Sequence, residues 1–143
     1  MRHRIPWIVA IAVVLPLLLT ACGGSSSSSE EASGPATVEL IEGTDISRIT
    51  LTAKAVERLD IQTADVQGSG AAKVIPYSAV LYSPNGETWA YVTSEPMTFM
   101  RQAIVVDRIE GNKAYLAKGP AAGAKVATVG VAELYGAESG LGQ

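Results

Sequence analysis

Few side chains in this sequence have the chemistry of a functional site, and two methionines are the first to consider. Met97 and Met100 flank Thr98-Phe99, and a pair of thioethers can bind Cu(I) or Ag(I). On a strand, however, residues three apart point to opposite faces, so both sulfurs would reach one ion only across a bulge. Methionine also fills irregular gaps in protein cores. Met97 and Met100 are therefore candidate metal ligands, with core filling as the alternative.

The residues that usually carry catalysis are missing or isolated. The single histidine is His3 and the single cysteine is Cys22, which leaves the rest of the chain without the groups for Ser-His-Asp or Cys-His catalysis and for nearly all zinc sites. Asp60 and Asp65 fit a helix end and an exposed strand face better than an acid–base pair. Ser78 has no base nearby in sequence. We expect no enzymatic activity, no catalytic residue and no cofactor.

The amino-terminal residues have the layout of an export signal. Arg2 and Arg4 precede an apolar run over residues 5–19, which is shorter than the about 20 residues of a membrane-spanning helix. Residues 19–22 read Leu-Thr-Ala-Cys and resemble the lipobox of bacterial lipoproteins. The resemblance implies that residues 1–21 are a signal peptide and that Cys22 is lipidated. An uncleaved membrane anchor and a free thiol are the alternatives.

Residues 22–37 are predicted to form the lipidated cysteine and a flexible tether. Residues 23–36 hold only small, polar, acidic and proline residues, which cannot bury enough apolar surface to order. A coil of this length spans roughly 20 Å. Without the signal peptide, nine basic and fourteen acidic residues remain, so nucleic acid is a poor partner. We expect a lipid-anchored protein of the cell envelope, on the periplasmic side of a membrane or on the outer cell surface.

Residues 38–138 are predicted to form one small, mainly β domain, followed by a flexible tail over residues 139–143. Short strands, rich in β-branched residues and separated by turns, are expected over residues 38–41, 46–51, 61–67, 73–75, 79–82, 88–93, 98–109, 114–118 and 125–129. The Asn85-Gly86 pair predicts a tight hairpin at residues 83–87, because it tolerates positive φ. Short helices are expected over residues 52–59, with Ala53, Val56 and Leu59 on one side, and over residues 131–135. The pattern predicts a small β sandwich or barrel-like fold.

Two stretches resemble the periplasmic adaptor subunits, or membrane fusion proteins, of resistance-nodulation-division efflux pumps, nearest to the heavy-metal branch. The longer stretch carries Ile-Pro at 75–76, the Asn-Gly hairpin that ends in Trp-Ala-Tyr-Val, and the glycines of KGPAAGAKV. The shorter stretch, residues 49–66, resembles the segment that enters the family's membrane-proximal domain, although Asp60 stands where glycine is common. In the family a β-barrel, a lipoyl domain and usually a helical hairpin separate the two stretches. Here only residues 68–72 do.

The resemblance implies an isolated membrane-proximal domain whose two parts close into one β unit across residues 68–72. It also implies docking on an inner-membrane efflux transporter or a full-length adaptor. The candidate partner-binding residues are Tyr82, Asn85, Gly86, Trp89, Tyr91 and Phe99. The alternative is that these aromatic side chains form the core. Trp89 and Tyr91 are expected on one face of their strand, with Ala90 and Val92 on the other.

The sequence therefore predicts a lipid-anchored, adaptor-like accessory protein of an efflux system that acts by protein–protein docking without catalysis. A metal- or solute-binding periplasmic lipoprotein is the alternative from another class. A decayed adaptor that keeps only a structural role is a third reading.

Overall fold

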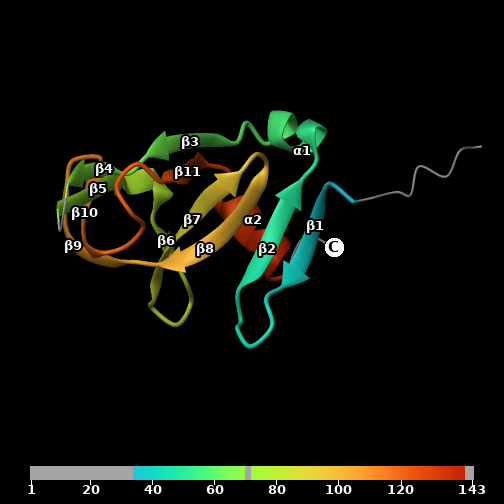
Figure 1. Ribbon diagram of the computed structural model, residues 1–143, viewed down its shortest axis with the longest axis horizontal. Coiled ribbons are helices and arrows are strands. Elements are labelled where there is room, and N and C mark those ends of the chain that lie inside the picture. The colour runs from blue at the N-terminus through green and yellow to red at the C-terminus, as the bar shows by residue number, and fades with distance from the viewer. Residues whose placement is uncertain (1–33, 70–71, 141–143) are drawn as a thin grey trace, which may run out of the picture. The chain divides into compact units, whose positions relative to one another are not determined.

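Strands dominate the part of the chain that the computed structural model describes, residues 34–69 and 72–140 (Figure 1). They build two antiparallel sheets. The larger sheet has seven strands in the order β1-β2-β8-β7-β11-β3, and the short β6 pairs with β7 at the same edge as β11. The bounds of its strands are β1 Ala36–Leu40, β2 Ser47–Leu51, β3 Gln62–Asp65, β6 Leu81–Tyr82, β7 Thr88–Glu95, β8 Thr98–Ala103 and β11 Lys125–Val129. The prediction of a mainly β sandwich or barrel-like domain is confirmed.

The smaller sheet has four strands in the order β4-β5-β10-β9. Its strands are β4 Gln67–Ser69, β5 Ala72–Pro76, β9 Val105–Glu110 and β10 Lys113–Lys118. β4 and β5 pair directly across residues 70–71, with Gln67 opposite Val74 and Gly68 opposite Lys73. The chain on either side of residues 70–71 is therefore held together by strand pairing, whereas β3, which precedes β4, lies in the larger sheet beside β11.

The chain passes between the two sheets four times, and the crossings share one core. They lie at Val66, at the short 3-10 helix Tyr77–Ala79, at Ile104 and at the loop that contains Pro120. Val66, Ala79, Ile104 and Pro120 are all buried, and the first three pack with side chains of both sheets. This first core consists of Val66, Ile75, Ala79, Ala90, Ile104, Ala114, Leu116 and Val126.

Two of these crossings correct the predicted strands. The strand expected over residues 61–67 divides at Val66 into β3 and β4, which belong to different sheets. The long strand expected over residues 98–109 divides at Ile104 into β8 and β9. The apolar, β-branched character of Val66 and Ile104 suits a strand, but their side chains are buried where the chain turns from one sheet to the other.

A second core lies between the other face of the seven-stranded sheet and two helices, α1 (Ala53–Arg58) and α2 (Val131–Glu138). It consists of Ile49, Leu51, Ala55, Tyr91, Phe99, Ala127 and Leu134. Thr52 caps α1, because its hydroxyl accepts a hydrogen bond from the Ala55 amide at 3.2 Å. Ala55, and not the expected Ala53, is the buried alanine of this helix.

The ends of the domain also differ from the expected bounds. β1 begins at Ala36, two residues before the predicted strand. α2 continues past residue 135 to Glu138, and the amides of Ser139 and Gly140 bond back to carbonyls of its last turn. The predicted signal peptide, Cys22 and residues 22–33 of the tether lie outside the described residues. Among the residues that are described, no helix is long and apolar enough to cross a membrane.

Candidate functional site

Three of the aromatic residues predicted for a docking surface are buried instead. Trp89, Tyr91 and Phe99 lie on β7 and β8, inside the seven-stranded sheet, and Tyr91 and Phe99 belong to the second core. Ala90 packs into the first core, on the opposite face of β7 from Tyr91. β7 is covered on both faces, so its aromatic side chains have no route to a partner. The alternative reading, in which these aromatic residues form the core, holds for all three.

The hairpin between β6 and β7 keeps the remaining predicted residues at the surface. Tyr82 is 51% exposed, and Asn85 and Gly86 are exposed at the turn. Tyr77, which the sequence reading did not select, is 42% exposed and lies beside Tyr82. We call Tyr77, Tyr82, Asn85 and Gly86 the hairpin surface. The sequence could have indicated Tyr77 through its position directly after Pro76, because Pro76 is the residue at which the 3-10 helix Tyr77–Ala79 begins.

The hairpin turn is held by its own hydrogen bonds. The Ser83 amide donates to the Glu87 carbonyl at 3.0 Å and the Gly86 amide to the Ser83 carbonyl at 2.9 Å. The Asn85 amide nitrogen donates to Glu87 Oε2 at 2.8 Å. Gly86 has φ +86°, the conformation that the Asn-Gly pair was expected to supply. A turn closed in this way loses little conformational freedom on binding, which favours its use as a recognition element.

The two tyrosines of the hairpin surface are neighbours, and each affects the surroundings of the other's hydroxyl. Partial burial, and then the hydrogen bond with Tyr77, raise the pKa of the Tyr82 hydroxyl above its ordinary value. The Tyr82 hydroxyl therefore stays uncharged at physiological pH. The two rings present apolar faces with hydroxyl tips, a combination that suits protein interfaces.

A buried polar cluster, which sequence reasoning missed, joins the end of α2 to the seven-stranded sheet. The Glu138 carboxylate, only 6% exposed, accepts three hydrogen bonds: from the Arg101 Nε at 2.8 Å, the Tyr91 hydroxyl at 2.5 Å and the Ser47 amide at 3.0 Å. Arg101, 12% exposed, also donates to Asp45 Oδ2 at 2.9 Å. The cluster satisfies a buried charge from three elements at once, so it fixes the position of α2.

The charges of this cluster act on its members' pKa values. Burial alone lowers the pKa of Arg101, but the hydrogen bonds and charges of Glu138 and Asp45 outweigh it, so the pKa lies above the ordinary arginine value. Burial, followed by the hydrogen bond and charge of Glu138, raises the pKa of Tyr91 far above that of a free tyrosine. The guanidinium carbon of Arg101 also lies 4.4 Å from the centre of the Trp89 ring, within range of a cation–π interaction. We attribute a structural role to the cluster, since it offers no open position for a substrate.

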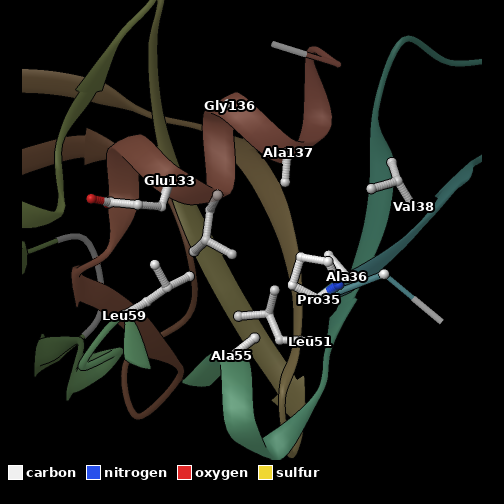
Figure 2. A pocket seen from close by; sticks show the side chains of 11 residues that line it. Pro35, Ala36, Val38, Leu51, Ala55, Leu59, Glu133, Gly136 and Ala137 are labelled. Atoms are coloured by element: carbon white, nitrogen blue, oxygen red, sulfur yellow. The ribbon is translucent and has the colours of Figure 1, made fainter. Parts of the chain in front are cut away.

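An apolar groove opens beside this core, between β1, β2, α1 and α2 (Figure 2). Its volume is about 640 Å³. Figure 2 shows the lining side chains around one shared space, with α2 on one side and β1 on the other. The lining residues are Gly34, Pro35, Ala36, Val38, Leu51, Ala55, Leu59, Glu133, Leu134, Gly136 and Ala137. The sequence reading did not find this groove, because its residues come from four elements and are mostly small.

The candidate metal ligands do not converge. Met97 lies in the turn before β8, with φ +61°, and lines a shallow cleft together with Phe99. Met100 follows Phe99 on β8, so the side chains of Phe99 and Met100 leave opposite faces of the strand. Met100 therefore points away from the cleft that Met97 and Phe99 line. Within residues 34–69 and 72–140 there is also no cluster of three or more His, Cys, Asp or Glu residues that could hold a metal ion. A Cu(I) or Ag(I) site built from both thioethers has no support in this geometry.

Comparisons with family models, with curated protein sequences and with solved structures found no match for this chain.

Proposed function

We propose that this chain is a lipid-anchored accessory protein of an efflux system of the resistance-nodulation-division type. It docks on an export transporter, or on a full-length adaptor, and carries out no catalysis. Lipid on Cys22 would hold it at a membrane of the cell envelope. The hairpin surface would make the protein–protein contact.

The observation that carries the proposal is the pairing of β4 with β5. The two stretches that resemble an adaptor are separated by whole domains in that family. Here Gln67, the residue that follows the first stretch, lies directly opposite Val74 of the second stretch. A two-part domain can lose its insert at little entropic cost only if its cut ends already lie together. The hairpin between β4 and β5 meets that condition, which favours an isolated membrane-proximal domain over an unrelated β protein.

The hairpin surface supports the docking step. It presents two neighbouring tyrosines beside a turn that its own hydrogen bonds hold in shape. Exposed tyrosines on a rigid support are typical of interaction surfaces, because they bury much area at a small entropic cost. Tyr115 of the four-stranded sheet differs from these two tyrosines, because its ring is covered by the Arg108 guanidinium, whose carbon lies 3.9 Å from the ring centre.

Site-specific photo-cross-linking in intact cells tests the proposal. A benzophenone amino acid at Tyr82 should link the full-length lipoprotein to one polytopic inner-membrane transporter or to an adaptor. The matched control places the same probe at Val105, which is 48% exposed on β9 of the other sheet, and should give no such product. The same product from both positions, or a Tyr82 product that survives the Asn85→Ala and Tyr77→Ala substitutions undiminished, would contradict docking through the hairpin surface.

A further inference from the structure

We propose that two copies of this chain associate through β1 to form a two-fold dimer with one continuous sheet. Among the described strands β1 pairs with β2 alone, and Figure 1 shows it at one end of the seven-stranded sheet. The open side of an edge strand can pair with a further strand through its backbone groups. This surface is separate from the hairpin surface, and the inference does not depend on the docking proposed above.

The backbone of β1 presents hydrogen-bonding groups on its outer side at every second residue. The Ile41 amide donates to the Ile46 carbonyl at 2.9 Å, in register with the pairing of β1 and β2. The direction of these groups alternates along an antiparallel strand, so the odd-numbered residues of β1 bond to β2. The amides and carbonyls of Ala36, Val38 and Leu40 therefore point away from β2, where the described part of the chain places no strand.

A two-fold axis at Val38 brings these outer groups together in matching pairs. Val38 then lies opposite the second copy's Val38, and Ala36 lies opposite the second copy's Leu40. Each of these residues donates one hydrogen bond and accepts one across the axis. All five residues of β1 are paired in this register. An axis at any other residue shortens the overlap of the two strands, and an axis at Glu39 would also set two carboxylates opposite one another.

The side chains of β1 complement each other in this register. On one face Ala36 packs against the second core, whereas Leu40 is 68% exposed, the highest value among the exposed large hydrophobic residues described. The pairing sets each exposed leucine opposite a small alanine. On the other face Thr37 lies opposite Glu39, and each Glu39 keeps its own Arg48 at 3.9 Å. Because no like charges are directly opposite, the edge suits a second copy of the same strand.

The edge strand β9 of the smaller sheet lacks this complementarity. It has six residues, and its longest two-fold overlaps are centred on Asp107 or on Arg108. Either axis sets like charges directly opposite one another, which is destabilising. β9 also has register shifts against β10, a feature that protects edges from further pairing. β1 is therefore the edge that fits a second copy, and the assembly closes at two because each copy uses its β1 once.

The contact is small, so we expect weak and reversible association. Strands of five residues bury less area than the roughly 1,200–2,000 Å² of stable complexes. A covalent trap, which collects paired molecules as they form, is therefore the measurement that suits this dimer.

Disulfide trapping with the full-length chain resolves the register. Thr37→Cys and Glu39→Cys are made in two copies with different tags, because both positions are exposed. In the proposed dimer they form a non-hydrogen-bonded pair, whose Cα atoms lie about 4.5 Å apart, within the range of a disulfide. The purified copies are mixed at a concentration of the order of 100 μM, where weak complexes form, and oxidised with diamide. We expect a link between positions 37 and 39 as the main product, above the baseline of the unaltered chain, whose single cysteine is Cys22.

Leu40→Lys and Ile109→Lys, each added to both tagged copies, form the matched pair of variants. Each places lysine at an exposed apolar position of an edge strand, since Leu40 is 68% and Ile109 43% exposed. Leu40→Lys removes the apolar contact with Ala36 and brings a charge to the interface. We therefore expect the initial rate of the 37–39 link to fall at least about tenfold, while Ile109→Lys keeps it. A thermal unfolding curve confirms that both variants fold.

The outcomes decide both the surface and the register. A 37–39 link that Leu40→Lys suppresses and Ile109→Lys preserves supports the β1 dimer. Links of 37 to 37 or of 39 to 39 in greater yield would refute the register and the complementarity argued from it. No link above the baseline, or a link that Leu40→Lys leaves unchanged, would overturn the dimer. The cross-link from Tyr82 tests docking through the hairpin surface separately, so either proposal can fail alone.

Discussion

Replacing Glu138 by alanine should destabilise the domain more than replacing any exposed residue of α2 by alanine. The carboxylate accepts hydrogen bonds from Arg101, Tyr91 and Ser47, and its side chain is 6% exposed. With alanine at position 138, Arg101 would keep Asp45 as its only carboxylate partner. The Tyr91 hydroxyl and the Ser47 amide would lose the acceptor that Glu138 provides. Removing one partner of a buried ion pair costs about 3–5 kcal/mol. A domain of this size is stable by about 5–15 kcal/mol, so this is a large share of the total.

The position of Glu138 sharpens this prediction. A carboxylate at the carboxyl end of a helix is disfavoured by the helix dipole. If Glu138 were exposed, its replacement by alanine would therefore stabilise the domain by a few tenths of a kcal/mol. The buried cluster and the dipole thus predict opposite signs. Glu138→Gln keeps the shape and one acceptor oxygen but removes the charge, and we expect it to lose about 1–3 kcal/mol.

Urea unfolding followed by circular dichroism measures these differences. Glu133→Ala is the matched control, because Glu133 is an exposed carboxylate on the same helix, and it should stay within about 0.5 kcal/mol of the unaltered protein. If Glu138→Ala unfolds at the same urea concentration as Glu133→Ala, the three hydrogen bonds do not hold α2 in solution and the reasoning is refuted.

Three further predictions concern strained or buried positions. Met97→Gly should raise the free energy of unfolding by about 1 kcal/mol, because Met97 has φ +61° and glycine adopts this conformation without strain. Met97→Val should lower the free energy of unfolding in the same urea titration, because a β-branched residue is strained at positive φ. Gly130→Ala should lower the free energy of unfolding by more than about 2 kcal/mol, because at φ +83° its Cβ would lie 2.0 Å from Ile61 Cδ1. Gly111→Ala also has positive φ but has open space around it, so it should lower the free energy of unfolding by only about 1 kcal/mol. Equal losses in the two variants would show that the Ile61 side chain moves aside. The pKa of Tyr91 is higher in the folded than in the unfolded state, so its contribution is complete below about pH 10, the unfolded value, and declines above it. Urea titrations between pH 8 and 11 should show a shallower alkaline decline for Tyr91→Phe, and an unchanged slope would contradict the assigned shift.

The local elements could be predicted from the sequence because their signals are local. Asn85-Gly86 between two apolar runs identified the hairpin, and its glycine has the expected positive φ. Thr52 identified the start of α1, and its hydroxyl makes the capping bond. Both features depend on residues within four positions of one another, so pattern reasoning has what it needs.

The crossings between the sheets could not be predicted in the same way. Ile104 continues the strand-like run of residues 98–109, and no Gly, Pro or Asn marks the corner there. The break arises because β8 pairs with β7 in one sheet and β9 with β10 in the other. That choice is made by partners far along the chain. Strand propensity reports only that a residue suits a pleated, half-buried surface.

The candidate site was predicted in part for a related reason. Exposure of Tyr82, Asn85 and Gly86 follows from their place at a turn. The burial of Trp89 and Tyr91 follows from the covering of β7 on both faces, which alternation along one strand cannot show. Glu138 stood at the predicted end of the domain, and its acceptor role could not be predicted because it depends on residues 37 to 91 positions away.

The separation between Ser47 and Glu138, 91 positions, has a consequence for biosynthesis. A nascent chain produces β2 well before α2, so the Ser47 amide, the Tyr91 hydroxyl and the Arg101 guanidinium await a common acceptor until α2 has been synthesised. Leu134, which closes the helix-covered core, arrives at the same late stage. Such high contact order slows folding and prolongs the lifetime of open strand edges. Synthesis of α2, and not the formation of the first hairpin, is therefore the step that allows the second core to close.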